Sequence, residues 1–162
     1  MNAPVDTELL NRAERQADVV RALSAVLPPH ALLWQTEDTV PYECDGLTAY
    51  RQRPLVVALP ETPEQVQAVL KACHALGVPV VARGAGTGLS GGAMPHALGV
   101  TLSLAKFNKI LKLDPYSRTA VVQCGVRNLA ISEAAAPLGL YYAPDPSSQI
   151  ACTIGGNVAE NS

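Results

Sequence analysis

Residues 83–92 read R-G-A-G-T-G-L-S-G-G, and residues 144–157 read P-D-P-S-S-Q-I-A-C-T-I-G-G-N. The first stretch has five glycines in ten residues, so its backbone is largely free of Cβ atoms and can adopt positive φ. Backbone N–H groups that converge on one concavity bind anions, and phosphate or pyrophosphate is the common biological anion of that size. The second stretch repeats the pattern with Gly155, Gly156 and Asn157. Together the two stretches predict two loops that hold one extended, phosphate-bearing ligand.

Residues 86–91 also match the G-x-G-x-x-G fingerprint of dinucleotide-binding Rossmann domains. That fingerprint must open a helix, because the helix N-terminus carries the pyrophosphate. Here the segment A-M-P-H at 93–96 and a strand-like run at 99–104 follow it, and neither has a helical pattern. Asp114, at about the distance of the ribose-binding acid, lies in the ordinary turn sequence D-P-Y-S. The context therefore argues against a Rossmann fold.

Composition predicts a globular protein. The chain has 162 residues, 48% of them hydrophobic and 16% charged, with a formal net charge of −2. No run of Lys and Arg is present, so nucleic acid is not an expected partner. The first residues lack a signal-peptide pattern, and no apolar run is long enough for a transmembrane segment. We expect a cytoplasmic protein, with peripheral attachment to the inner membrane through partners left open.

The sequence shows no catalytic or metal-binding constellation. The cysteines are Cys44, Cys73, Cys124 and Cys152. They form no C-x-x-C pair, and three lie among apolar or small residues, which is typical of buried reduced thiols. The three histidines are equally scattered. We therefore predict no metal site and no hydrolase triad.

Two helices are predicted in the first half of the chain. Apolar periodicity indicates one over residues 7–27, stopped by two prolines at 28–29. The second begins with Thr62 as N-cap and Pro63 in its first turn, with Gln65 completing a capping box and Gly77 ending it. Its apolar stripe is Val66, Val69, Leu70 and Cys73.

Five strands are predicted, at residues 55–59, 78–81, 100–104, 110–113 and 119–123. The first two enclose the second helix and form a right-handed βαβ unit. The last two flank the turn at 114–117 and form a hairpin. Asn128 is placed to cap a short helix at 129–136, after which the second glycine stretch is expected in loop.

The last four residues, A-E-N-S, follow the second glycine stretch without a further helix or polar tail. A sheet with strands on one side only would leave an unpaired edge. These observations predict a domain that is incomplete at its C-terminus.

Several motifs in a fixed order resemble a known family. They are R-G-A-G-T-G-L-S-G-G, P-D-P-S-S, C-T-I-G-G-N-V-A-E-N-S, Y-E-C-D-G-L-T at 42–48 and L-P-E-T-P-E-Q-V at 59–66. The chain resembles the FAD-binding domain of the vanillyl-alcohol-oxidase type (PCMH-type, or type 2). Within that group it is most similar to the FAD-linked subunit of glycolate oxidase and the D-lactate dehydrogenases.

The resemblance implies an α+β fold of two small α/β subdomains, the second truncated, with FAD between them. We expect an N-terminal helical segment at residues 1–35 and the incomplete FAD-binding domain at 36–162. The resemblance implies these cofactor-binding residues: Arg83, Gly84, Ala85, Gly86, Thr87, Gly88, Leu89, Ser90, Pro144, Asp145, Thr153, Gly155, Gly156 and Asn157.

Two positions bear on how the cofactor is held. Relatives that attach flavin covalently often carry histidine where Thr87 stands, so the resemblance implies non-covalent FAD. Arg83 either contacts the cofactor or pairs with Asp145, and the sequence does not separate the two. Asp145, between two prolines, fits a turn better than a catalytic acid.

The implied function is oxidation of a 2-hydroxy acid, of the glycolate or D-lactate type, to the 2-oxo acid by hydride transfer to FAD. Other subunits of a glycolate oxidase-like complex are implied as partners. In the family the base, the carboxylate-binding groups and any metal ligands lie in later parts of the chain, so no catalytic residue is named. The alternatives are a non-catalytic truncated FAD-binding module and an oxidase of the same fold acting on another alcohol or a sugar.

Overall fold

The computed structural model describes residues 7–162. Its helices are α1 (Thr7–Ser24), α2 (Thr36–Thr39), α3 (Pro63–Ala75), α4 (Asn128–Ala135) and α5 (Ile154–Ala159), with 3-10 turns η1 (Pro29–Ala31), η2 (Val40–Tyr42) and η3 (Ala136–Leu138). Its strands are β1 (Leu32–Leu33), β2 (Val56–Ala58), β3 (Val80–Arg83), β4 (Val100–Ser103), β5 (Ile110–Asp114) and β6 (Thr119–Val122). The predicted mixture of helices and strands is confirmed, while the expectation about a signal peptide concerns residues outside the described part.

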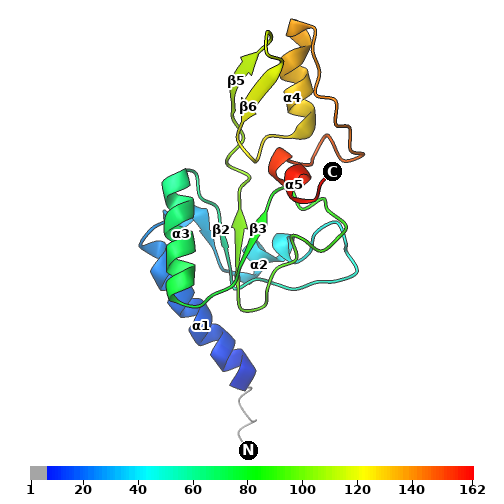
Figure 1. Cartoon of the computed structure of the whole chain (residues 1–162). Coiled ribbons are helices and arrows are strands. Elements are labelled where there is room, and N and C mark those ends of the chain that lie inside the picture. The colour runs from blue at the N-terminus through cyan, green and yellow to red at the C-terminus, as the bar shows by residue number, and fades with distance from the viewer. Residues whose placement is uncertain (1–6) are drawn as a thin grey trace, which may run out of the picture.

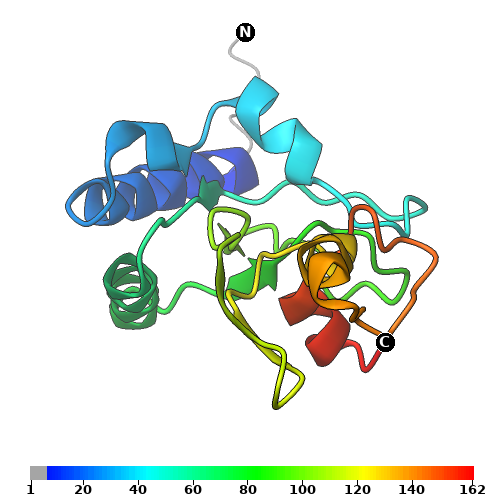
Figure 2. The same ribbon diagram turned by 90° about the horizontal axis from the view of Figure 1, so that it is seen from above.

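The elements form two small units. One is a four-stranded sheet in the order β1-β2-β4-β3, and the other is the β5–β6 hairpin with α4. Figure 1 shows the sheet with α1 and α3 at one end of the molecule, the hairpin with α4 at the other, and α5 between them. Seen from above in Figure 2, α1 and α3 lie on the side away from α4 and α5.

The sheet differs from the predicted βαβ unit in one respect. Strands β2 and β3 enclose α3 and run parallel, as expected, but they do not pair with each other. Instead β4 lies between them and pairs in parallel with both, so that Thr101 is the partner of Val57 on one side and of Val81 on the other. The glycine-rich residues 84–92 therefore belong to the connection between two adjacent parallel strands.

Helices α1 and α3 bury one face of the sheet. Val19 and Leu23 of α1 and Val69 of α3 are fully buried in a cluster with Val56 and with the alternate residues Val100 and Leu102. Strand β2 is buried along its whole length, as its continuous apolar run predicted. Leu70 was wrongly assigned to the buried stripe of α3, because its side chain is 44% exposed.

The capping of α3 follows the prediction with one correction. The Thr62 side chain accepts a hydrogen bond from the Gln65 backbone N–H at 3.3 Å, which is the expected N-cap. The Gln65 Oε1 atom, however, accepts from the Glu61 N–H at 2.7 Å and not from that of Thr62. Gly77 has φ of +59° just beyond the helix, as a C-terminal stop requires.

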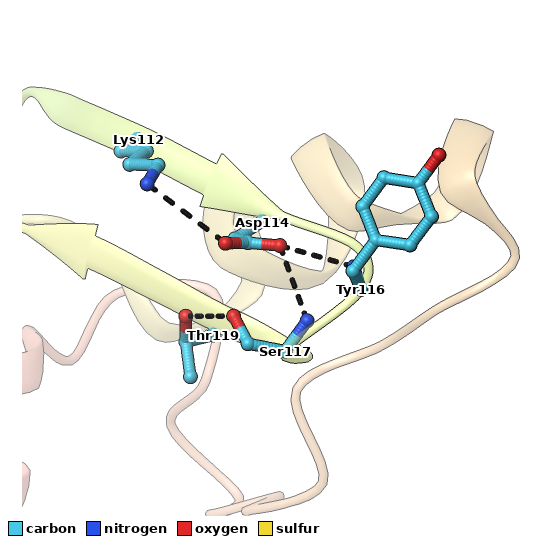
Figure 3. Close-up of polar contacts among 5 residues, drawn as sticks. All are labelled: Lys112, Asp114, Tyr116, Ser117 and Thr119. Carbon is cyan, nitrogen blue, oxygen red and sulfur yellow. Dashed lines mark hydrogen bonds and ion pairs between the residues drawn. The ribbon is translucent and has the colours of Figure 1, made fainter.

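The turn at 114–117 is the local structure that the sequence predicted (Figure 3). Asp114 Oδ1 accepts from the N–H groups of Tyr116 at 3.0 Å and Ser117 at 3.1 Å. Hydrogen bonds from the Ser117 backbone and side chain, and then from the Tyr116 backbone, lower the pKa of the Asp114 carboxyl. Asp114 is thereby a turn residue of the β5–β6 hairpin, in which it pairs with Thr119, and not a ribose-binding acid.

Candidate functional site

The first glycine stretch leaves β3 and crosses the molecule without forming a helix. Gly86 and Gly91 have φ of +71° and +79°, conformations that favour glycine. A helix is also absent from the rest of the connection to β4 in this described segment, which confirms that the G-x-G-x-x-G match is not a Rossmann fingerprint. The loop therefore presents mainly backbone groups, as its glycine content predicted.

The N–H groups of this loop are unused by the protein. Within the described residues, none of the backbone N–H groups of residues 84–92 donates a hydrogen bond to another protein group. Residues 84–92 are half-buried or exposed, so these nine consecutive amides are open to solvent or to a ligand. The loop therefore offers a run of donors suited to an anion.

The loop is held from one side by Arg83, the last residue of β3. Its Nη1 donates to the carbonyl oxygen of Cys44 at 2.7 Å, and its guanidinium lies 5.6 Å from the ring centroid of Tyr42. In the described part of the chain no ion pair joins Arg83 to Asp145, whose side chain is exposed. The structure places the Arg83 side chain between the loop and residues 42–44.

The second glycine stretch was expected in loop, and this expectation is wrong. Gly155, Gly156 and Asn157 lie in α5, in ordinary helical conformation. Gly155 is required by a close approach: a Cβ atom there would lie 2.9 Å from Cys124 Cβ and 3.0 Å from the Cys124 carbonyl oxygen. The two stretches thus use glycine for different reasons, the first for its free backbone and the second for helix packing.

Gly84 and Thr153 bring the two stretches together. A Cβ atom on Gly84 would overlap Thr153 Oγ1, so only glycine fits at position 84. Thr153 precedes α5 and is 7% exposed, and its backbone forms an isolated bridge with Arg127. Its Oγ1 is buried without a partner among the described residues. An unpaired buried hydroxyl beside a run of unused amides indicates a ligand.

A cleft of about 400 Å³ lies between the loop and α5. Of the expected cofactor-binding residues, those that line it are Gly84, Ala85, Gly86, Thr87, Gly88, Leu89, Thr153, Gly156 and Asn157. A second cavity of about 530 Å³ extends toward β5 and α4, and it shares Gly84, Ala85 and Thr153 with the first. The two cavities therefore lie next to each other at the contact between Gly84 and Thr153.

The remaining expected site residues do not line the cleft. They are Arg83, Ser90, Pro144, Asp145 and Gly155, and from the P-D-P-S-S segment Pro146, Ser147 and Ser148 line it instead. The Ser90 hydroxyl donates to a Glu160 carboxylate oxygen, which ties the end of the loop to the end of α5. Among the lining residues Glu160 alone carries a charged side chain.

Asn128 is a residue whose role the sequence did not reveal. It was expected to cap α4, but the N-cap residue is Arg127 and Asn128 is fully buried inside the first turn. Its Nδ2 donates to the Pro144 carbonyl at 2.9 Å, and its Oδ1 accepts from Asn157 Nδ2 at 2.9 Å. One amide therefore joins α4, the P-D-P-S-S segment and α5. An asparagine among apolar and small residues was the available signal.

The site contains no metal centre within the described residues, where no three His, Cys, Asp or Glu side chains lie close enough to hold an ion. The described helices also include none long and apolar enough to cross a membrane. No Lys or Arg side chain lines the cleft, so the donors it offers to an anion are backbone amides and hydroxyl or amide side chains.

Comparison with known proteins agrees with this geometry. A family model described as "FAD binding domain" matches residues 54–162. The chain is 62% identical over 146 residues to the glycolate oxidase subunit GlcD of Escherichia coli K12, covering 90% of this chain and 29% of that protein. It is 38% identical over 136 residues to a D-lactate dehydrogenase of Anaerostipes hadrus, covering 83% of this chain and 28% of that protein. It thus spans less than a third of the length of these relatives.

The fold is also similar to that of solved structures. An alkyldihydroxyacetonephosphate synthase superposes with a TM-score of 0.79 at 23% identity, over 90% of this chain and 32% of that chain. At this identity the likeness concerns the fold alone.

Proposed function

The chain belongs to the FAD-binding domain family, and from this premise we propose that it forms the diphosphate-binding part of a flavoenzyme that oxidises a 2-hydroxy acid. The relatives named above supply the substrate class, glycolate or D-lactate, through their names. The observation that carries the proposal is the run of unused amides at 84–92, in a loop that lines a cleft next to the unpaired Thr153 hydroxyl.

The residues of the cleft fit FAD. A diphosphate needs several donors at close range, and Gly88, where a Cβ would meet no protein atom, leaves the backbone open to it. The Thr153 hydroxyl, lacking a protein partner, is available to the cofactor. Two neighbouring cavities that share Gly84, Ala85 and Thr153 suit a cofactor with nucleotide and flavin ends. We assign the cofactor-binding role to the residues predicted from the sequence that line this space, with Pro146, Ser147 and Ser148 added.

The protein's contribution to the reaction is binding and orientation. When bound, FAD supplies the acceptor for the hydride that leaves the α-carbon of the 2-hydroxy acid as its hydroxyl becomes the 2-oxo group. The amides of residues 84–90 hold the diphosphate and so fix the distance of the flavin from the substrate. No residue of this chain is assigned as the base.

Non-covalent attachment is part of the proposal. Thr87 lines the cleft at the position where covalent attachment would need a histidine, and a hydroxyl does not form that bond to flavin. Association with other subunits of a glycolate oxidase-like complex is also proposed, because the E. coli relative is named as a subunit.

The test uses the full natural chain that carries this segment. We expect the purified protein to show flavin absorption, and acid or heat denaturation to release intact FAD into the supernatant, identified by mass. Reduction of an artificial electron acceptor should follow addition of glycolate or D-lactate. Protein that neither contains nor binds FAD would refute the proposal. If the protein binds FAD and turns over a phenol or a sugar but neither acid, the proposed substrate class is wrong and the proposed FAD-binding role stands.

A further inference from the structure

The motif Y-E-C-D-G-L-T at 42–48 has no role in the function described so far. It lies outside the cleft, and none of its residues lines either cavity at the glycine loop. Yet it contacts the loop twice. Cys44 accepts the hydrogen bond from Arg83, and Gly46 lies against the carbonyl groups of Thr87 and Gly88.

The contact at Gly46 is the tighter of the two. A Cβ atom at this position would lie 2.7 Å from the Thr87 oxygen and 2.7 Å from the Gly88 oxygen. Such separations are well inside van der Waals contact, and both neighbours are backbone atoms that move only if the loop moves. Glycine at position 46 therefore allows the loop backbone at Thr87 and Gly88 to pack directly against residue 46.

The direction of these carbonyls decides the direction of two amides. In a trans peptide the C=O and N–H of one unit point in opposite directions. The Thr87 carbonyl shares its peptide unit with the Gly88 N–H, and the Gly88 carbonyl shares its unit with the Leu89 N–H. Both oxygens contact residue 46, so the peptide units that carry the Gly88 and Leu89 N–H groups are packed against it. Gly88 and Leu89 line the cleft while Gly46 does not, so these units lie between residue 46 and the cleft.

The segment around Gly46 is itself fixed. Asp45 is 4% exposed, and its Oδ1 accepts from the Leu47 N–H at 2.9 Å, which closes a small turn around Gly46. The Gln52 N–H donates to the Glu43 carbonyl at 2.7 Å, and Arg51 pairs with the Glu43 carboxylate at 2.7 Å. Arg83 then links this rigid turn to the start of the loop.

We infer that Gly46 is a positioning residue of the cofactor site. Its lack of a side chain lets the backbone of Thr87 and Gly88 pack against residue 46, and this packing holds the Gly88 and Leu89 N–H groups in place for the cofactor diphosphate. This inference rests on the proposed function, because the diphosphate is that of FAD. A side chain at position 46 rotates or displaces these peptide units and removes one or both donors from the phosphate oxygens.

The experiment compares Gly46→Ala with a matched control in the full natural chain. Gly99→Ala introduces the same kind of clash, since a Cβ there would lie 2.8 Å from the Pro79 carbonyl oxygen. Gly99 immediately precedes β4 and so lies at the opposite end of the parallel strands from the loop. Apoprotein of each variant is titrated with FAD and followed by flavin fluorescence.

We expect Gly46→Ala to raise the Kd for FAD about 10- to 100-fold, the range for losing one charge-assisted hydrogen bond. Gly99→Ala should leave this Kd within about threefold of the unsubstituted protein, although its thermal midpoint falls. Hydrogen exchange at saturating FAD gives a second readout. The cofactor should protect residues 87–89 in the unsubstituted protein and in Gly99→Ala, but not in Gly46→Ala.

A milder variant serves if Gly46→Ala does not fold. Tyr42→Leu removes the ring beside the Arg83 guanidinium, adds no clash, and should raise the Kd for FAD about two- to tenfold. An unchanged Kd in Gly46→Ala, or equal losses in Gly46→Ala and Gly99→Ala, would overturn this inference while leaving the proposed function intact. Protection of residues 87–89 in Gly46→Ala would overturn it as well. Absence of FAD binding in the unsubstituted protein would instead refute the proposed function, and this inference with it.

Discussion

Gly84 lies directly against the side chain of Thr153, although the two residues come from different units of the fold. The contact leaves no room for a Cβ atom at position 84, and it buries a hydroxyl that has no partner among the described residues. The tight Gly84–Thr153 contact and the unpaired Thr153 hydroxyl therefore lie at the same place, and both residues line the two cavities of the site.

The first prediction concerns this contact. Gly84→Ala should lower the free energy of unfolding by about 1–3 kcal/mol, because the added methyl overpacks against Thr153. Combining it with Thr153→Ala should recover part of that loss, since the smaller side chain vacates the space. Thermal melts of the two single variants and the double variant measure this coupling. Strictly additive losses would contradict the proposed contact.

The Thr153 hydroxyl can be examined alone with Thr153→Val, which keeps the shape of the side chain. Because Oγ1 has no protein partner, the apoprotein should be as stable as the unsubstituted form, or slightly more stable. FAD binding should weaken by about tenfold if the hydroxyl meets the cofactor. Isothermal titration with FAD and an apoprotein melt give the two values, and unchanged affinity would remove Thr153 from the site.

The second prediction concerns Asn128. Asn128→Ala leaves the Pro144 carbonyl and the Asn157 amide without their partner inside the protein. We expect a loss of about 1–3 kcal/mol in the free energy of unfolding, the cost of leaving buried polar groups unpaired. Asn108→Ala is the control, since Asn108 is exposed and its side chain makes no hydrogen bond with the described residues. Equal thermal midpoints for the two variants would show that the amide chain does not contribute.

The third prediction is a pH dependence at the hairpin. The folded-state pKa of Asp114 is lowered, chiefly by the hydrogen bonds of Ser117, so the folded protein binds this proton less readily than the unfolded chain. The carboxylate therefore contributes stability above the unfolded pKa of about 4, and this contribution is lost as pH falls through the lower folded pKa.

Asp114→Asn should accordingly reduce the thermal midpoint at pH 6–7 and match the unsubstituted protein more closely as the pH approaches about 3. Melting curves across this pH range test it. Asp38→Asn is the control, because the Asp38 carboxylate accepts no hydrogen bond within the described residues. A difference between Asp114→Asn and the unsubstituted protein that stays constant with pH would rule out the ionised carboxylate as its cause.

The fourth prediction concerns the cap of α3. Thr62→Ala removes the hydrogen bond to the Gln65 N–H and should cost about 1 kcal/mol. Thr48→Ala, at an exposed position in irregular chain, should have little effect. Amide exchange locates the change: the first turn of α3 should exchange faster in Thr62→Ala, while the glycine loop should not. Uniform acceleration across the protein would indicate a wider disturbance than a lost cap.

Short-range rules predicted much of the fold. The start and end of α3 depend on residues within the helix and next to it, and Thr62 and Gly77 act as their sequence context indicates. The turn at Asp114 is equally local. The order of the strands is not local, because nothing near β2 or β3 specifies that β4 will lie between them. The predicted βαβ unit is therefore present with parallel strands, but the strand that lies between them was not foreseen.

The site likewise has features that local sequence predicts and features that depend on distant contacts. The unused amides follow from the glycine content of residues 84–92, which the sequence displays. The need for glycine at position 155 follows from the approach of Cys124, a residue distant along the chain. The role of Asn128 likewise depends on Pro144 and Asn157, which only the folded chain brings to it. Contacts between residues so far apart in the sequence can be identified only in the three-dimensional structure.

The position of β4 also has a consequence for how the protein acquires its cofactor during synthesis. A nascent chain that has emerged only as far as Arg83 holds both outer parallel strands, but lacks the strand that joins them. The sheet can close only after Ser103 has emerged, and that same step ties down both ends of the glycine loop. The cradle for the diphosphate is therefore expected to form together with the sheet, and a half-made chain should have no affinity for flavin.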